Sequence, residues 1–194
     1  MENKILYLLY KEGYVNKSNI VILQEGLKRI KNFITDFGLA IMISGIMGNV
    51  LAGAMMQIMY TTLRCYAGGY HASNEKKCRW LSWFSMIICL VFINSDYLNN
   101  IRYTIFHLLT FLSSISIIVL SPVESINKPL IKREKEVFNK RSNIIVVFMN
   151  IAYFFALIKK IRILIRVIGC VLIEVFIGML ISILFKKLQT ERIA

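Results

Sequence analysis

A histidine and a cysteine seven residues apart are the clearest chemical feature of this chain. His71 and Cys78 lie in the segment LRCYAGGYHASNEKKC, residues 63–78. A thiol becomes an effective nucleophile when it is ionised and has a base beside it. The basic side chains of Lys76, Lys77 and Arg79 flank the cysteine and favour the thiolate. The pair therefore predicts a nucleophile, Cys78, and a general base, His71, in a compartment that keeps thiols reduced.

The spacing of this pair requires a bend in the chain. On one continuous helix, seven residues would separate the two side chains by roughly 10 Å along the axis, too far for direct proton transfer. Gly68 and Gly69 permit a turn before the histidine. Ser73 or Asn74 is positioned to cap a new helix. We therefore expect the nucleophile in the first turns of that helix, with the base folded back towards it.

Other assignments of these residues stay open at this point. A histidine and a cysteine in a charged loop often carry no chemistry, and Cys65 is a second candidate nucleophile. A zinc site made by Cys65, His71 and Cys78 lacks a fourth ligand at a usual spacing, so neither a metal nor another cofactor is predicted. His107 lies in an apolar run, and we interpret it as a neutral side chain bonded to a neighbouring helix.

The elements that carry the motif have the composition of membrane helices. Hydrophobic residues make up 57% of the chain and the mean hydropathy is +0.61, whereas soluble domains are about 45–50% apolar. A helix needs about 20 apolar residues to cross a bilayer. Five runs carry no charge apart from Glu174 in the last: 37–63, 80–95, 103–123, 142–158 and 167–185. The chain is therefore predicted to be all-α, a polytopic membrane helical bundle with four to six membrane helices.

Residues 1–36 have a different pattern, in which apolar residues recur at helical spacing among basic ones. Gly13 separates two such pieces, and the second has its apolar positions at Ile20, Leu23, Leu27, Ile30 and Ile34. Amphipathic helices of this kind lie in the membrane interface rather than across it. The predicted organisation is thus a pair of amphipathic interfacial helices in 1–36, followed by a membrane-embedded part in 37–194.

The first uncharged run, 37–63, is rich in small residues. If it is one helix, two neighbouring ridges form: Ser44, Gly48 and Ala52, and Gly45, Asn49, Gly53 and Gln57. Small residues at this spacing let helices approach closely, and buried amides bond across the contact. We expect this helix to pack against protein. Gln57 lies on the stripe that leads towards Arg64, which makes it a candidate for lining a site.

Lysine and arginine counts predict the orientation. Four lie in 64–79 and six in 122–141, but only Arg102 lies between the second and third runs. The motif 64–79 and the basic loop 122–141 are therefore predicted on the cytoplasmic side. Residues 1–36 and 159–162 are also basic, so either the first or the fourth run is re-entrant or one basic segment lies outside. The net charge of +13 is interpreted as these topology signals and lipid-headgroup contacts, with no nucleic-acid partner.

Two segments resemble motifs of one known family. RCYAGGYHASNEKKC, residues 64–78, resembles the central motif of the accessory gene regulator B (AgrB) family, the membrane peptidases of Gram-positive peptide quorum sensing. SPVESINKPL, residues 121–130, resembles a second feature of that family, which follows the third span. The resemblance extends over nearly the whole chain.

The resemblance implies a cysteine endopeptidase that cuts the C-terminal tail from a short AgrD-like propeptide and assists its cyclisation. By position, Cys78 would be the nucleophile and His71 the base. Arg64, with Gly68 and Gly69, would support the site. The second motif holds Pro122, Glu124, Lys128 and Pro129, which are interpreted as structural or as contacts to the substrate tail. The implied setting is the cell membrane, with lipid contacts and a homodimer.

Two alternatives come from other functional classes. A non-enzymatic peptide permease or export partner would explain the spans and the basic loops, but gives no reason for a cysteine and histidine at this spacing. A structural or sensory subunit would explain the small-residue ridges through oligomerisation. Substituting Cys78 separates the peptidase from both.

Overall fold

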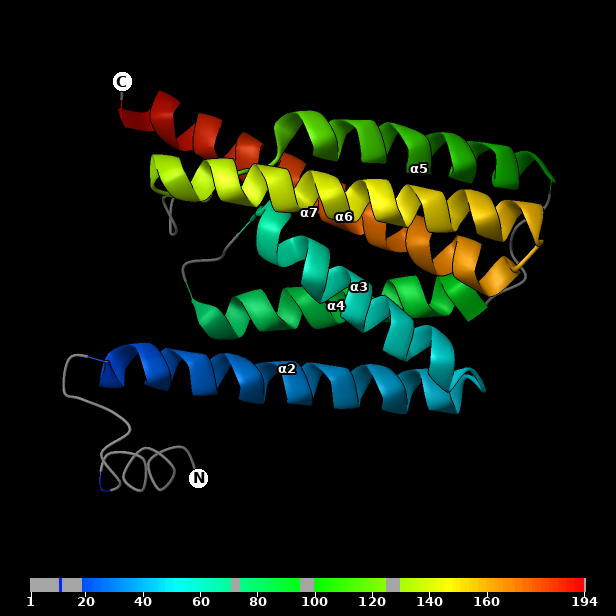
Figure 1. Ribbon diagram of the computed structural model, residues 1–194, viewed down its shortest axis with the longest axis horizontal. Helices are drawn as coiled ribbons and strands as arrows, with labels where there is room; N and C mark the ends of the chain where they lie inside the picture. The colour runs from blue at the N-terminus through cyan, green and yellow to red at the C-terminus, as the bar shows by residue number, and fades with distance from the viewer. Residues whose placement is uncertain (1–10, 12–18, 71–73, 95–99, 125–129, 194) are drawn as a thin grey trace. The chain divides into compact units, whose positions relative to one another are not determined.

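The computed structural model describes residues 11, 19–70, 74–94, 100–124 and 130–193. Within these ranges the regular structure is helical, apart from one isolated β-bridge between Gly68 and Val123. The helices are α2 (Ile20–Ile46), α3 (Val50–Ala67), α4 (Glu75–Asn94), α5 (Asn100–Leu120), α6 (Lys132–Ile158) and α7 (Arg162–Ile193). Figure 1 shows them in chain order from blue to red.

Four helices in the described part of the chain are long and apolar enough to cross a membrane. These segments are Lys76–Asn94, Arg102–Leu120, Lys132–Ile158 and Arg162–Leu188. Each has at least 19 residues, which at 1.5 Å per residue is close to the roughly 30 Å of a bilayer core. The predicted fold class, an all-α polytopic membrane helical bundle, is confirmed at the lower limit of four membrane helices.

The chain divides into two compact units, Met1–Leu39 and Ala40–Ala194. In the first unit the structure describes mainly the amphipathic part of α2, where Ile30 and Ile34 are exposed alongside Arg29 and Lys31. The helix does not end near residue 36 as expected, but runs through Asp36 and Gly38 and continues to Ile46. Gly13 and its flanking residues lie outside the described ranges.

The expectation that residues 37–63 form one span is wrong, because the chain turns between α2 and α3. Gly48 has a φ of +77°, a left-handed conformation that glycine adopts without steric cost. Asn49 caps α3 by accepting a hydrogen bond from the amide of Ala52 at 3.3 Å. A side chain on Gly53 would overlap Ser44, so the small residues bring the two helix ends together instead of forming ridges on one helix. The first run therefore does not cross as a single helix.

The fourth run belongs to one continuous 27-residue helix, α6, which begins at Lys132. Its start is capped by Glu134, whose carboxylate accepts a hydrogen bond from the amide of Ile131 at 3.1 Å. Residues 132–141, expected as part of a basic loop, are thus the first turns of a membrane-length helix. Re-entry of the fourth run, one of the three alternatives for the topology, is not what the structure shows, because α6 is continuous.

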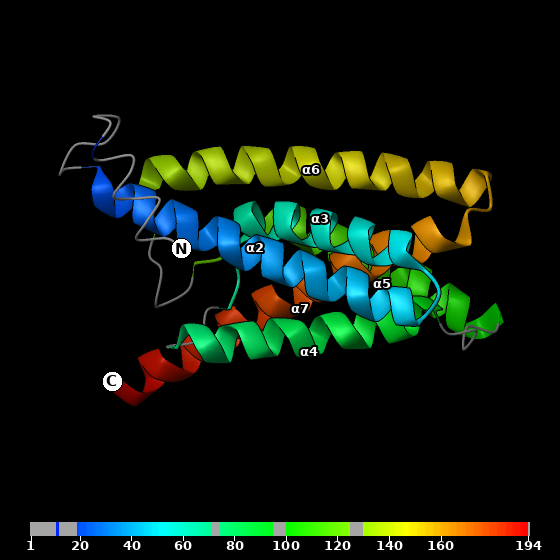
Figure 2. The ribbon, with the colours of Figure 1, turned by 90° about the horizontal axis from the view of Figure 1, so that it is seen from below.

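Helix α7 is the central element of the second unit. It contacts α3, α4, α5 and α6, and Figure 2 shows it between α4 and α6, which lie on opposite sides. Glycines permit its close contacts: a side chain on Gly169 would overlap Phe106 of α5, and one on Gly178 would overlap Arg64 of α3. The fold therefore brings α7 against the end of α3 that leads into the motif.

Candidate active site

The bend predicted at the glycine pair is present. Helix α3 ends at Ala67, and Gly68 and Gly69 follow with φ values of +76° and +120°, a region that side chains disfavour. The same glycines contact the second motif, because the amide of Gly69 donates to the carbonyl of Val123 at 3.0 Å. In return, the amide of Val123 donates to the carbonyl of Ala67 at 2.9 Å. The two motifs are therefore joined by their backbones.

Asn74 begins the next helix, as expected. Its side-chain oxygen accepts a hydrogen bond from the amide of Lys76 at 3.0 Å, and its carbonyl accepts one from the amide of Cys78 at 3.1 Å. Cys78 is therefore half-buried in the first turns of α4, and no unbroken helix joins it to Arg64. His71 and Ser73 lie outside the described residues, so the approach of the histidine to the cysteine stays a prediction.

Arg64 is held between the glycine turn and α7. Its Nη2 donates to the carbonyl of Tyr70 at 2.6 Å. The guanidinium lies so close to Gly69 and Gly178 that a Cβ at either position would overlap Nη1. The amide of Tyr70 in turn donates to the carbonyl of Gly178 at 2.9 Å. Arg64 thus has a fixed position beside the motif, which suits a group that orients a substrate.

A cavity of about 480 Å³ extends from Cys78 and Arg64 between α3, α4, α5 and α7. Its volume is within the range usual for ligand sites. The polar residues that line it are Tyr60, Arg64, Tyr70, Cys78, Ser82, Ser85, Cys89, Cys170 and Glu174. The remaining lining is mostly apolar and aromatic, including Leu81, Ile88, Phe92, Phe106, Leu109 and Ile177. The candidate nucleophile is therefore at one end of a largely apolar cavity.

Glu174 is a residue of this cavity that sequence reasoning noted only as an interruption of an apolar run. Its carboxylate accepts hydrogen bonds from the hydroxyl of Ser85 and, at 3.7 Å, from the thiol of Cys89. An ionisable residue inside a membrane helix is costly and commonly functional. This rule could have identified Glu174 as a candidate functional residue from the sequence, but the sequence does not show which residues bond to its carboxylate.

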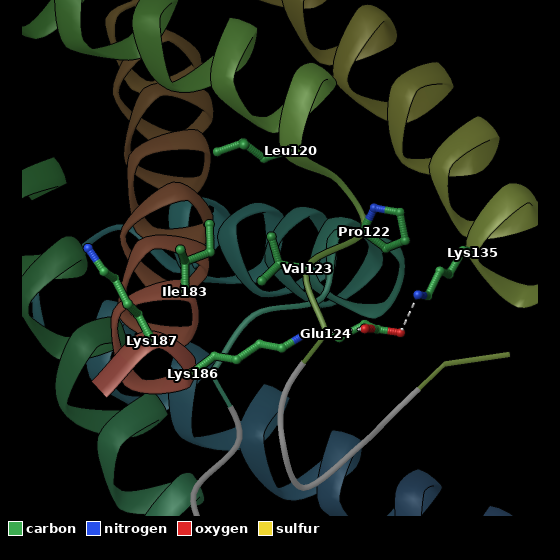
Figure 3. A pocket seen from close by; sticks show the side chains of 8 residues that line it. All are labelled: Leu120, Pro122, Val123, Glu124, Lys135, Ile183, Lys186 and Lys187. Atoms are coloured by element: carbon green, nitrogen blue, oxygen red, sulfur yellow. Dashed lines mark ion pairs between the residues drawn. The ribbon is translucent and has the colours of Figure 1, made fainter. Parts of the chain in front are cut away.

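Glu124 of the second motif links three elements next to the glycine turn. Figure 3 shows its carboxylate between Lys135 of α6, at 2.8 Å, and Lys186 of α7, at 3.6 Å. The amide of Leu130 donates to the same carboxylate at 3.2 Å. The hydrogen bond from Lys135, helped by that amide and by the charge of Lys186, lowers the pKa of Glu124. Lys128 and Pro129 lie outside the described residues.

The side chains of Figure 3 line a second cavity of about 440 Å³, with Pro122 and Val123 on one side and α7 on the other. Ser182 of α7 donates to the carbonyl of Glu124 at 3.1 Å. The second motif thus contacts α6 and α7 through side chains and the glycine turn through its backbone. This placement agrees with a structural role for Glu124.

Three other candidates lie apart from this arrangement. The amide nitrogen of Gln57 donates to Thr61 on its own helix at 3.2 Å, and Cys65 is exposed; neither is among the described residues that line the Cys78 cavity. His107 bonds to the hydroxyl of Tyr153 on α6 at 2.6 Å, which confirms its interpretation as a residue bonded to a neighbouring helix. In the described ranges, no three His, Cys, Asp or Glu side chains are grouped to hold a metal ion.

Comparison with known proteins identifies the family. The family model described as accessory gene regulator B matches residues 2–184, nearly the full chain. No curated protein sequence and no solved structure matches it. Together with the two joined motifs and the four membrane-length helices, this match shows that the chain belongs to the accessory gene regulator B family, which is associated with the processing of agr quorum-sensing peptides.

Proposed function

We propose that this protein is a membrane cysteine endopeptidase that removes the C-terminal tail of an AgrD-like propeptide and assists the cyclisation of the remaining peptide. The observation that carries the proposal is the position of Cys78. It lies in the first turns of α4, lines a cavity together with Arg64, and follows the glycine turn that leads to His71. A helix start beside basic residues is a setting in which cysteines act as nucleophiles.

The first half of the reaction forms an acyl-enzyme. His71 accepts the thiol proton of Cys78, and the sulfur attacks the carbonyl carbon of the scissile peptide bond. The C–N bond then breaks, and His71 returns the proton to the amine of the departing tail. The rest of the substrate remains joined to Cys78 as a thioester.

The second half closes the ring. A thiol or hydroxyl of the substrate attacks the thioester carbonyl, and the sulfur of Cys78 leaves and regains a proton. Exchange of one thioester for another is nearly isoergic, whereas hydrolysis is downhill, so the site has to exclude water and hold the attacking group close. A largely apolar cavity lined by membrane-length helices supports that requirement.

The other residues have supporting roles in this proposal. Arg64, fixed between the glycine turn and α7, orients the substrate through its charge. Glu124 belongs to the segment that holds the turn in place, and Lys128 contacts the substrate tail. In this proposal the protein acts in the cell membrane as a homodimer, with the motif on the cytoplasmic side, as the lysine and arginine counts predict.

The test is to follow the mass of the propeptide with purified protein in lipid. Wild type and Cys65→Ser are expected to release the C-terminal fragment, while Cys78→Ser and His71→Ala are not. A covalent adduct at Cys78 would identify the nucleophile. Equal processing by all four proteins would contradict these roles. Binding without processing by every variant would favour the non-enzymatic permease instead.

A further inference from the structure

One face of α4 is polar from Cys78 to Cys89. Cys78, Ser82, Ser85 and Cys89 are spaced by four, three and four residues, so they lie on one side of the helix, and all four line the cavity. At 1.5 Å per residue, Ser85 is about 10 Å and Cys89 about 16 Å along the axis from Cys78. Polar side chains therefore lie at increasing distances from Cys78 along α4.

Two charged side chains complete this polar line. Arg64 lines the same cavity as Cys78 and lies against Gly178 of α7. Glu174 is one helical turn further along α7 and accepts hydrogen bonds from Ser85 and Cys89. The cavity thus has a cationic group at the end of α3 and a carboxylate beside Ser85, which is about 10 Å from Cys78 along α4.

The other walls are apolar. Leu81 and Ile88 of α4, Phe106 and Leu109 of α5, and Ile177 of α7 face the same space. An extended peptide has the matching chemistry, because its apolar side chains can contact these walls while its backbone amides and carbonyls bond along a polar line. A buried backbone group left without a hydrogen-bond partner is unfavourable, so a bound peptide needs such a polar line. A lipid acyl chain has no polar groups that could form hydrogen bonds along this line.

We infer that this cavity is the substrate channel, and that it holds about three consecutive, mainly apolar substrate residues on one side of the scissile bond. The length follows from geometry, because an extended chain advances about 3.3 Å per residue and the distance to Ser85 and Glu174 is about 10 Å. Glu174 accepts a hydrogen bond from the third of these residues. The inference rests on the proposed function, since it takes Cys78 as the reacting end of the channel.

A cross-linking experiment tests the occupant without requiring cleavage. In the Cys78→Ser background, a photo-reactive residue replaces either Leu109, which lines the cavity, or Leu108, its neighbour on α5. Both side chains are exposed in the protein alone, so the pair differs chiefly in the direction that each faces. With the propeptide bound in lipid nanodiscs, cross-links to the peptide are expected from position 109 and not from 108. Cross-links from 109 to lipid alone, with bound peptide present, would overturn the inference.

A kinetic experiment tests the length and the role of Glu174. Aspartate is placed in the propeptide at each of five positions on both sides of the scissile bond. At the first three positions of one side we expect kcat/KM to fall by about 100-fold or more, because an unpaired charge in an apolar site is costly, with little change beyond. If aspartate changes kcat/KM equally at every position while the unmodified propeptide is still cleaved, the inference that this cavity is the substrate channel is overturned.

Variants of the protein complete the test. Leu109→Trp is expected to raise KM by about 10-fold or more, while the matched Leu108→Trp leaves it unchanged. Glu174→Leu is expected to raise KM by about 10-fold, and Glu174→Gln, which keeps an acceptor oxygen, by less. Unchanged kinetics in Leu109→Trp would contradict the inference. If wild type cleaves no propeptide, the proposed peptidase fails, and the cross-linking result still decides whether a peptide occupies the cavity.

Discussion

Gly68 and Val123, which are more than fifty residues apart in the chain, form a parallel β-bridge that joins the two motifs. The bridge is made by main-chain atoms, and a side chain on Gly68 would overlap the carbonyl of Val123. The glycine turn that precedes His71 in the sequence is consequently held by the segment that follows α5. Changes in that segment should affect catalysis without touching the nucleophile.

The effect of the close contact at Gly68 can be measured separately from the effect of its left-handed backbone conformation. Gly68 and Gly48 have nearly the same φ, +76° and +77°, but only Gly68 has a neighbour within reach of a Cβ. Gly48→Ala is expected to cost about 1–2 kcal/mol for the left-handed conformation alone. Gly68→Ala should cost more and also abolish most cleavage, because the bridge must open. Thermal unfolding and propeptide cleavage measure the two effects. Equal losses in both variants would contradict a role for the bridge.

Arg64 gives a second prediction, through Gly178. A Cβ at Gly178 would overlap the guanidinium, so Gly178→Ala is expected to displace it and lower kcat/KM by about 10-fold or more. The matched variant is Gly45→Ala in α2, where the added Cβ would make an ordinary contact of 3.6 Å with Val50. This variant should keep full activity, and its stability should be unchanged or slightly higher, because alanine is the better helix former. Full activity in Gly178→Ala would show that the position of Arg64 is not critical.

Glu124 predicts a pH dependence of stability. The hydrogen bond from Lys135 holds the pKa of Glu124 below its ordinary value of 4.5. A depressed folded-state pKa stabilises the protein above the unfolded value, and this contribution is lost as the pH falls through the folded pKa. Between pH 6 and pH 3, at roughly unit intervals, the Tm of wild type should therefore fall more steeply than that of Glu124→Gln.

The control for this prediction is Glu136→Gln, which removes an exposed carboxylate of α6. It should retain the wild-type profile. Parallel profiles for wild type and Glu124→Gln would mean that the contacts of Glu124 with Lys135 and Lys186 contribute nothing to stability.

Local signals in the sequence are sufficient to predict the bend in the site and the start of the helix that follows it. A glycine pair, an Asn at a capping position and a cysteine four residues later fixed the expectation at Gly68, Asn74 and Cys78, and each depends on only a few neighbouring residues. His107 was also anticipated, because a histidine in an apolar run needs a partner. The membrane class followed from composition alone.

Longer-range features were not predictable in the same way. The turn at Gly48 lies inside an uncharged run, and hydropathy does not register a turn made by one glycine and one capping Asn. The charges of residues 132–141 favour a loop, yet lysine, arginine and glutamate are good helix formers and extend α6. The partners of Glu174 come from another helix, and one sequence does not show which helices meet.

The two histidines should respond differently to substitution. His107 is bonded to Tyr153 at 2.6 Å, between α5 and α6 and away from the described lining of the Cys78 cavity. His107→Phe should lower stability by about 1 kcal/mol through loss of that bond while leaving kcat/KM within about twofold of wild type. Tyr153→Phe should have the same effect, and the double variant should cost little more than either single change, because both remove one interaction. Loss of cleavage in His107→Phe with the fold intact would move the search for the catalytic base from His71 to the third membrane run.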